Sequence, residues 1–511
     1  MRTFRTVLEK LIWQRRQTVE EFAESVELFA REHGEPGTIS VRHLQRLVSG
    51  RGPGGRPLGT VRPATARLLE RMLGVTVDEL LASATDDHEV DLEGAGLVPK
   101  EAGDTVGGWV PEATREEVAA LVDGLSLDEV QDRGVRLRGV RRSRLAAALA
   151  DYYDAASGGL LYRPSVDGHR VATSVLTRAE WLDLSIPLGP DTDRIGLADV
   201  ELDSVGRIER GHAVDRLTEA AMLGVRITNE PLYRLLDVDI RGGVISGSVG
   251  LAPFGVYALT MDLLERELAD ALVNGRPIGR GDLPLRDRYL PDVETVLDLH
   301  GRLCAGGVVA LCAIARPADA YRGEADYALL VQERSGQVVN AAGRLAVIPK
   351  GFHEPLTDVA GDARIGATLV REMEEELFGR AELDSTADGR RAAAPMHSSR
   401  LSEAMRWLTA SPARLRMECT GFGFNLVSGN YEFACLVVIE DEEFWPQFGG
   451  VVEANWESAG LRVYSSLDDH LLAKLAGDES WSNEGLFAFL QGLRRLRDVG
   501  GRRVKLPAVE L

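Results

Sequence analysis

The chain has no long apolar run, and this excludes several classes of protein. The longest apolar stretch without a charge, Leu303 to Ala315, has 13 residues, whereas a membrane-spanning helix needs about 20. The N-terminal segment interrupts its apolar residues with charges and has no signal-peptide core. We therefore expect a cytoplasmic protein that neither spans a membrane nor is secreted.

Cysteine and lysine are also scarce. The four cysteines match no zinc or redox spacing and are interpreted as small core residues of a reduced protein: Cys304, Cys312, Cys419 and Cys435. Only 5 of the 59 basic residues are lysine. A GC-rich genome produces this bias, so a single arginine carries little functional information. The 511 residues suffice for roughly three domains at about 150 residues each.

Charge is distributed unevenly along the chain. The net charge of the whole chain is −20, but residues 1–75 hold 13 basic and 8 acidic residues, a net charge of +5. The remaining 436 residues therefore carry −25. A basic N-terminal head on an acidic body indicates that the head contacts a polyanion and the body does not.

Residues 1–84 are predicted to be entirely helical. The segment 4–17 has the apolar stripe of an amphipathic helix, and Thr18 begins a capping box before a second helix that reaches Gly34. A short third helix begins at Ser40 and ends at Gly50. A basic, glycine-rich loop and two further helices complete the head, the last capped by Thr76.

This layout is that of a helix-turn-helix domain, in which one short helix enters the major groove of DNA. The third helix turns Val41, Leu44 and Leu47 towards the core. The candidate DNA-binding residues are polar positions of that helix and two loop arginines suited to phosphates: Arg42, His43, Gln45, Arg46, Arg51 and Arg56. The alternative is a small helical protein-interaction domain with a solvated polar face.

The head resembles the Cro/repressor-type (XRE) helix-turn-helix family over about 65 residues. Ala23 occupies the tight packing position of the second helix. The turn between the second and third helices is longer than is usual in that family. The resemblance implies double-stranded DNA as a partner. Because proteins of this class bind two symmetric half-sites as dimers, we expect a homodimer.

The middle of the chain carries no recognisable motif. Residues 85–112 mix Asp, Glu and Gly and are interpreted as a linker. Residues 113–300 are predicted to be helical to about Tyr153 and mixed α/β beyond, with a hairpin turning near Gly242 and a helix over Tyr257–Val273. A bridging or dimerising role for this region is only a hypothesis.

Residues 303–500 alternate strands and helices and are predicted to form an α+β or α/β sandwich. Strands are expected within 327–332, 344–348 and 437–439, and helices within 367–378 and 483–497. The predicted fold is therefore multidomain: an all-α helix-turn-helix head, a mixed α/β centre and a C-terminal α/β sandwich.

Acidic residues cluster on the helix predicted over 367–378. Glu372, Glu375 and Glu376 are spaced i, i+3 and i+4 and would share one face, with Leu369, Met373 and Leu377 on the buried side. Converging carboxylates repel one another unless a cation lies between them, and Mg²⁺ prefers such oxygen ligands. The alternative is an acidic surface helix.

The run Arg371-Glu372-Met373-Glu374-Glu375-Glu376 resembles the second half of the Nudix box. It follows a segment, IPKGF, at the position of that family's glycine loop, and SNEGLFAFLQGLRRL resembles its closing helix. The resemblance covers about 170 residues. It implies a Nudix-like sandwich, with Glu375 and Glu376 as Mg²⁺ ligands, Glu372 as a ligand or catalytic base, and Arg371 orienting these carboxylates. Gly351, His353, Glu354 and Arg371 are the candidate ligand-binding residues.

The first half of the box departs from the family pattern. Thr357 and Ala363 occupy the positions of its Gly and Glu. If Gly351 is the box glycine, about six residues are inserted, and the expected acid falls on Thr357, beside Asp358. The glycine after the paired glutamates is one position late, at Gly379. Such a site can bind a nucleoside-diphosphate derivative without hydrolysing it well.

Two functions are compatible with these patterns. The first is a cytoplasmic, ligand-responsive transcriptional regulator whose head binds DNA and whose Nudix-like domain senses a nucleoside-diphosphate-type metabolite. The second is a Mg²⁺-dependent Nudix hydrolase with a helical recruitment domain. The basic head favours the first, and only an intact box would favour the second.

Overall fold

The computed structural model describes residues 5–14, 76–81, 109–122, 124–154, 160–198, 207–225, 227–321, 323–334, 343–378, 396–397, 400–449 and 458–511, with ten helical positions between residues 22 and 73. The chain divides into two compact units, Met1–Gly108 and Trp109–Leu511. Within the described residues, no helix is both long enough and apolar enough to cross a membrane.

The first unit has a core of aliphatic residues and one phenylalanine. Its described helices are α1 (Val7–Gln14) and α5 (Val77–Leu81), and the ten single positions are also helical. Leu44 and Leu47 are buried, as their spacing predicts. The core consists of Val7, Leu8, Leu11, Ile12, Phe22, Val26, Leu44, Leu47, Val48, Leu68, Leu69, Leu73 and Leu80.

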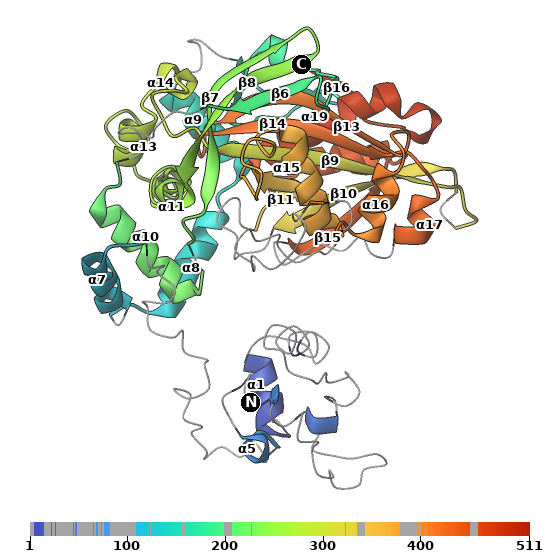
Figure 1. Cartoon of the computed structure of the whole chain (residues 1–511). Helices are drawn as coiled ribbons and strands as arrows, with labels where there is room; N and C mark the ends of the chain where they lie inside the picture. The colour runs from blue at the N-terminus through green and yellow to red at the C-terminus, as the bar shows by residue number, and fades with distance from the viewer. Residues whose placement is uncertain are drawn as a thin grey trace. The chain divides into compact units, whose positions relative to one another are not determined.

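A ten-stranded mixed sheet organises the second unit (Figure 1). Its strands are β1 (Leu160–Leu161), β4 (Val175–Thr177), β5 (Ile186–Pro187), β9 (Gly306–Arg316), β10 (Asp326–Arg334), β11 (Leu345–Val347), β12 (Lys350–Phe352), β13 (Leu415–Asn425), β14 (Asn430–Ile439) and β15 (Ser458–Ser465). The order is β1-β4-β13-β14-β9-β10-β11, and β5, β12 and β15 add to β13, β9 and β10. Only β14 and β9 are parallel among these described pairs.

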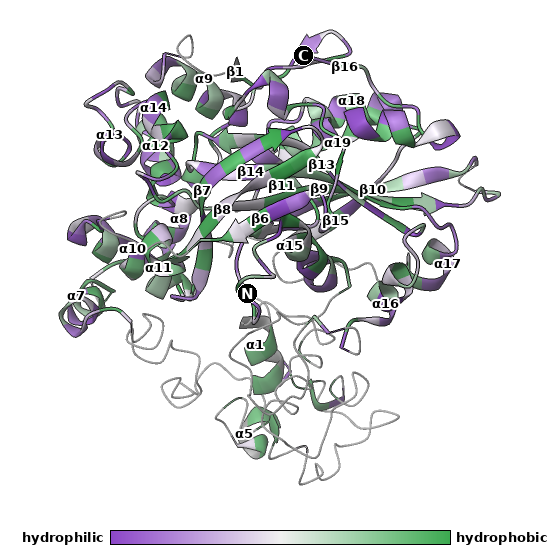
Figure 2. Cartoon of the chain, turned by 45° about the horizontal axis from the view of Figure 1, so that its top comes forward, coloured by the Kyte–Doolittle hydropathy of each residue, from purple (hydrophilic) through white to green (hydrophobic). Residues whose placement is uncertain are grey.

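Helices cover both faces of this sheet. Along β9, Val308 shares one core with Leu369 of α15 (Ile365–Glu372), whereas Val309 shares the other with Phe487 of α19 (Asn483–Val499). All eleven residues of β9 are buried, because a strand between two helical layers has no solvated face. The apolar run seen in the sequence is thus a central strand. Figure 2 shows hydrophobic residues along the neighbouring β13 and β14.

Two small sheets and further helices complete the second unit. The sheets are β16-β2-β3 and β6-β8-β7. The strands are β2 (Ser165–Val166), β3 (His169–Arg170), β6 (Asp193–Leu197), β7 (Pro231–Arg241), β8 (Val244–Pro253) and β16 (Val509–Glu510). The helices are α7 (Glu112–Val122), α8 (Leu127–Arg138), α9 (Arg142–Tyr152), α10 (Arg210–Leu223), α11 (Phe254–Ala258), α12 (Leu263–Val273), α13 (Pro284–Tyr289), α14 (Val293–Leu297), α16 (Glu403–Thr409), α17 (Phe444–Phe448) and α18 (Asp469–Ala476), with 3₁₀ turns at Ala179–Trp181 and Gly501–Arg503.

The predicted hairpin and strands are present. Gly242 and Gly243 join β7 to β8 with φ of +57° and +77°, the left-handed pair that a tight hairpin turn requires. The strands and helices expected in the C-terminal region are also observed, and all four cysteines are buried and free. Trp481 stacks on Phe489 of α19 with ring centroids 5.0 Å apart.

The expected boundary near residues 300–303 does not separate two compact units. β1, β4 and β5 come from the central region, yet they pair with one another or with β13 of the C-terminal region. Both regions consequently share one core. The linker prediction also differs at its end, since Trp109 belongs to the second unit and donates from its indole nitrogen to the Ile227 carbonyl at 3.3 Å. Residues 85–108 lie outside the described residues.

The predicted helix Tyr257–Val273 is two helices, α11 and α12. Between them the Thr260 hydroxyl donates to the Val256 carbonyl at 2.6 Å. Asp262 is buried and accepts from Arg216 at 3.2 Å. A buried carboxylate must meet its partner, and the turn at 259–262 allows that contact. Apolar periodicity does not reveal such a break.

Candidate functional site

The Nudix-like segment is built by β12 and α15, which pack against each other and against β9. Gly351 of β12 pairs with Val308, and the Glu372 carboxylate lies directly over its α-carbon. A Cβ atom at Gly351 would be 2.0 Å from Glu372 Oε1. Glycine is thus required at this position because a side chain from α15 approaches the backbone.

Arg371 ties this helix to the loop after β12. Its guanidinium donates to the carbonyls of Phe352 and Glu354 at 2.9 and 3.1 Å and to Glu372 Oε1 at 2.8 Å. Burial alone would lower the pKa of Arg371, but the carboxylates of Glu354, Glu372 and Glu375 raise it above its ordinary value. Arg371 therefore stays charged, and its Nη1 and Nη2 atoms donate to the protein itself, whereas its Nε has no hydrogen-bond partner among the described residues.

The carboxylate helix is not a regular α-helix throughout. After Glu372 it continues as a π-helix, Met373–Leu377, so the expected helix over 367–378 starts earlier and changes its pitch. The angular spacing expected for a regular α-helix therefore does not hold across Met373–Leu377. Glu372 and Glu376 are buried, Glu375 is half-buried, and Glu374 is fully buried. The buried positions expected for Leu369, Met373 and Leu377 are observed.

Protein donors bind the buried carboxylates. The Lys350 backbone N–H and the Gln332 side-chain amide donate to Glu376 at 2.5 and 3.3 Å. The Ser402 hydroxyl and backbone N–H donate to Glu374 at 2.6 and 3.0 Å. These contacts join the helix to β10, β12 and the start of α16. The carboxylates therefore hold the fold together locally.

The expected Mg²⁺ centre stays a prediction. Mg²⁺ requires several oxygen ligands in octahedral geometry. Across the part of the chain that the structure describes, no three His, Cys, Asp or Glu side chains come together as a metal ligand set. Asp358, beside the position of the missing box acid, is exposed and accepts from the Gly361 backbone. Gly379 lies outside the described residues.

His353 is a core residue. Its Nδ1 lies 2.8 Å from the Tyr431 hydroxyl, and the Tyr233 ring is 4.5 Å away between centroids. Burial, aided by the charge of Arg371, lowers the pKa of His353 to about 3. The imidazole is consequently neutral and enclosed by aromatic rings. Glu354, its neighbour, keeps a side chain 40% exposed.

A buried ion pair connects the other side of β12 to the last helix. Lys350 Nζ lies 2.7 Å from Glu484 Oε1, and the Asn425 amide donates to the second oxygen of Glu484 at 2.9 Å. Nearby, burial raises the pKa of Glu432 well above its ordinary value. Sequence reasoning missed this network, because its members lie on β12, β13, β14 and α19 and form no linear motif.

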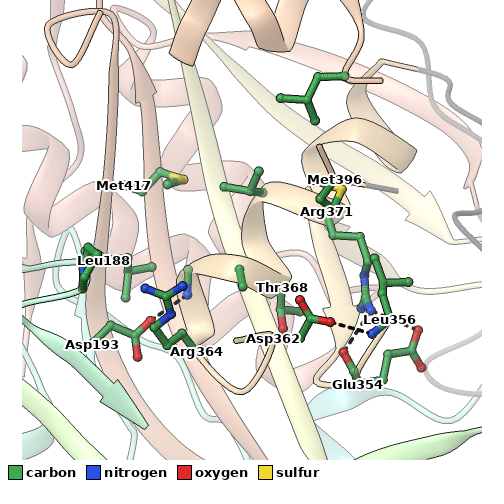
Figure 3. A pocket seen from close by; sticks show the side chains of 16 residues that line it. Leu188, Asp193, Glu354, Leu356, Asp362, Arg364, Thr368, Arg371, Met396 and Met417 are labelled. Atoms are coloured by element: carbon green, nitrogen blue, oxygen red, sulfur yellow. Dashed lines mark hydrogen bonds and ion pairs between the residues drawn. The ribbon is translucent and has the colours of Figure 1, made fainter. Parts of the chain in front are cut away.

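A cavity of about 280 Å³ opens beside α15 (Figure 3). Two of the candidate ligand-binding residues, Glu354 and Arg371, line it, whereas Gly351 and His353 do not. The four other polar residues in its wall were not identified from the sequence: Asp193, Asp362, Arg364 and Thr368. Asp193 comes from the central region, where the sequence offers no motif.

The candidate DNA-binding residues are described at one position only. Arg46 is helical and half-buried. Arg42, His43, Gln45, Arg51 and Arg56 lie outside the described residues.

Comparison of the chain with protein-family models gives no match, and a search of curated proteins gives none either.

Proposed function

We propose that this chain is a DNA-binding transcriptional regulator whose C-terminal part senses a nucleoside-diphosphate-type metabolite. The basic head, with a net charge of +5 in residues 1–75, supports contact with the DNA backbone. The resemblance of the segment around Arg371 to the Nudix box supports the ligand class. The protein would act in the cytoplasm as a homodimer on symmetric half-sites.

One observation carries the choice of a sensor over a hydrolase. The buried carboxylates of Glu372 and Glu376 accept from Arg371, Lys350 and Gln332. A hydrolytic Nudix-type centre needs carboxylate oxygens for Mg²⁺, which would neutralise the pyrophosphate and activate water. Carboxylates already bound by protein donors favour a site that binds without turnover.

Regulation requires that the ligand favours one conformation of the body over another. A ligand that binds both conformations equally shifts nothing, however tight the complex. The experiment must therefore measure DNA binding and its response to the ligand together.

The first test is selection of genomic fragments by the purified full-length protein, with and without a panel of nucleoside diphosphates. We expect enrichment of a few short, roughly palindromic sites, and at least one diphosphate that changes it. The double variant Arg42→Ala, Arg46→Ala should bind those sites at least about tenfold more weakly. A matched control is Arg136→Ala, Arg241→Ala, which removes two exposed arginines of the second unit. Equal loss in both variants would refute the assigned recognition helix.

The same preparation tests the hydrolase alternative. Each diphosphate is incubated with Mg²⁺, and released phosphate or nucleotide is measured for the wild type and Glu376→Gln. We expect no turnover in either protein. Turnover that is abolished by Glu376→Gln, together with no enrichment of DNA sites, would replace the regulator by the hydrolase.

A further inference from the structure

The cavity beside α15 has mostly apolar walls. Leu188 and Pro190 precede β6, Val370 lies on α15, and Met417 lies beside Leu188, whose backbone N–H donates to the Met417 carbonyl at 2.9 Å. Its volume of about 280 Å³ lies near the lower end of small-molecule sites, which are about 300–1,000 Å³. Apolar walls with a few converging polar groups are the usual form of such sites.

Asp193 is the first polar group in the wall. Its side chain is buried, with 2% of the residue exposed. The Gly366 backbone N–H at the start of α15 donates to Oδ2 at 2.8 Å. The backbone N–H groups of Ile195 and Ile365 also lie near this carboxyl, but no group among the described residues meets the geometry of a hydrogen bond to its other, buried oxygen, Oδ1. A buried carboxylate oxygen without a donor is costly, and a bound ligand would supply that donor.

Thr368 is the second polar group. It lies two residues after Gly366 on α15, is 2% exposed, and lines the same cavity. Its hydroxyl is buried and has no hydrogen-bond partner within the described ranges. Two buried polar groups without partners in one wall are a second, independent sign of a missing ligand.

The charges in the wall decide which ligand fits. Three carboxylates, Asp193, Glu354 and Asp362, face two guanidinium groups, Arg364 and Arg371. Arg371 already donates to two carbonyls and to Glu372. Arg371 Nε has no hydrogen-bond partner among the described residues, and the guanidinium of Arg364 attracts the Asp193 carboxylate. With three carboxylates against two guanidinium groups, the wall still keeps a net negative charge, which favours an ammonium or another N–H donor over a phosphate.

We propose that this cavity binds a small amine with an apolar body, whose ammonium or N–H group donates to Asp193 Oδ1 and whose neighbouring polar atom meets the Thr368 hydroxyl. The cavity shares Glu354 and Arg371 with the candidate ligand-binding residues but excludes Glu372 and Glu376, and the binding of an amine to Asp193 does not depend on the proposed function. The amine supplies the hydrogen bonds that Asp193 and Thr368 lack, and its apolar part replaces water against Leu188 and Met417.

The test is a ligand-observed NMR and thermal-shift screen of the full-length protein. The probes are primary and secondary amines with apolar bodies of about six to twelve carbon atoms, each paired with its carboxylate isostere. We expect some amines to bind and their carboxylate partners not to bind. Asp193→Asn should weaken those amines at least about tenfold, because a charge-assisted hydrogen bond is lost. Thr368→Val should weaken them less.

Two further variants test whether the amines bind at Asp193 and inside this cavity. Asp191→Asn makes the same change at an exposed position two residues away and should bind amines like the wild type. Ala367→Leu fills the cavity and leaves Asp193 in place, so it should abolish binding while the protein stays folded. The proposal is overturned if no amine binds, if Asp193→Asn and Asp191→Asn bind equally, or if Ala367→Leu binds like the wild type.

Discussion

The backbone of Gly351 and the carboxylate of Glu372 are in direct contact across the junction of β12 and α15. A Cβ atom on Gly351 would lie 2.0 Å from Glu372 Oε1 and Cδ, far inside van der Waals contact. Arg371 holds the Glu372 carboxylate from the other side at 2.8 Å. The carboxylate cannot withdraw without breaking this ion pair, so the spacing between strand and helix is set by the absence of a side chain on Gly351.

Gly351→Ala should consequently destabilise the second unit by about 1–3 kcal/mol, the usual cost of forcing extra atoms into a packed site. The measurement is the free energy of unfolding by urea. Gly196→Ala is the matched control, because Gly196 is also on a β-strand but a Cβ there meets nothing within 4 Å. If both variants lose the same stability, the contact with Glu372 does not set the spacing.

Breaking the buried ion pair between Lys350 and Glu484 by a single substitution should greatly lower the free energy of unfolding. Removing one partner by Lys350→Met or Glu484→Gln leaves the other charge or its donors buried without compensation, at a cost of about 3–5 kcal/mol. The double variant should lose less than the sum of the two, since no lone charge remains. Unfolding free energies of the wild type and the three variants give the coupling. Lys474→Met, at an exposed lysine of α18, should change stability little, and additive losses at 350 and 484 would refute the coupling.

Much of the second unit could be predicted from local sequence patterns. The turn at Gly242–Gly243, the strand β14 and the helix α19 follow from glycine placement and apolar periodicity, which act within a few residues. The shared sheet could not be predicted in this way. Leu176 of β4 pairs with Phe424 of β13, a contact between segments far apart in the sequence. No local sequence feature of either strand identifies the other as its partner.

In the candidate site, too, the sequence predicts some local features but not the contacts between distant segments. The sequence pointed to Arg371 and to the glutamates after it, but the π-helix over Met373–Leu377 could not be predicted, because a pattern with a 3.6-residue period does not reveal a change of pitch. His353 was chosen because it lies beside Gly351, yet it packs between Tyr233 and Tyr431. Asp193 reaches α15 from a different sheet, so only the tertiary structure reveals it.

His353 predicts a loss of stability in acid. Burial lowers its pKa to about 3, from 6.5 in an unfolded chain. Between these values the unfolded state binds one more proton, so the free energy of unfolding falls as the pH falls, by about 1.4 kcal/mol per unit. His353→Asn, which can still accept from Tyr431, should remove this slope. Urea unfolding from pH 7 to 4 measures it, with the exposed His169→Asn as control. An unchanged slope in His353→Asn would show that another group causes the acid sensitivity.

Asp193 predicts the opposite slope. Burial raises its pKa to about 6, from 3.8, so between these values the folded state binds the extra proton. The stabilisation is complete below pH 3.8 and is lost as the pH rises through 6. The wild type therefore loses stability between pH 4.5 and pH 7, whereas Asp193→Asn does not. The free energy of unfolding of Asp193→Asn, relative to that of the wild type, should rise by roughly 2 kcal/mol over this range. Asp191→Asn should show no such change. A constant difference between Asp193→Asn and the wild type across this range would contradict the buried, charged state.

Mg²⁺ should not stabilise the folded protein. A metal that binds the folded state alone raises the free energy of unfolding with the logarithm of its concentration over its Kd, and the melting temperature rises accordingly. Since the carboxylates of Glu372 and Glu376 already accept from protein donors, millimolar Mg²⁺ should leave the melting temperature of the wild type unchanged. Calorimetric scans with and without Mg²⁺ measure this, with Ca²⁺ as a control for a general ionic effect. A rise specific to Mg²⁺ that disappears in Glu376→Gln would show that the metal displaces the Lys350 and Gln332 donors. The hydrolase would then become the better explanation of the box, because a metal that competes successfully for these oxygens could also activate water.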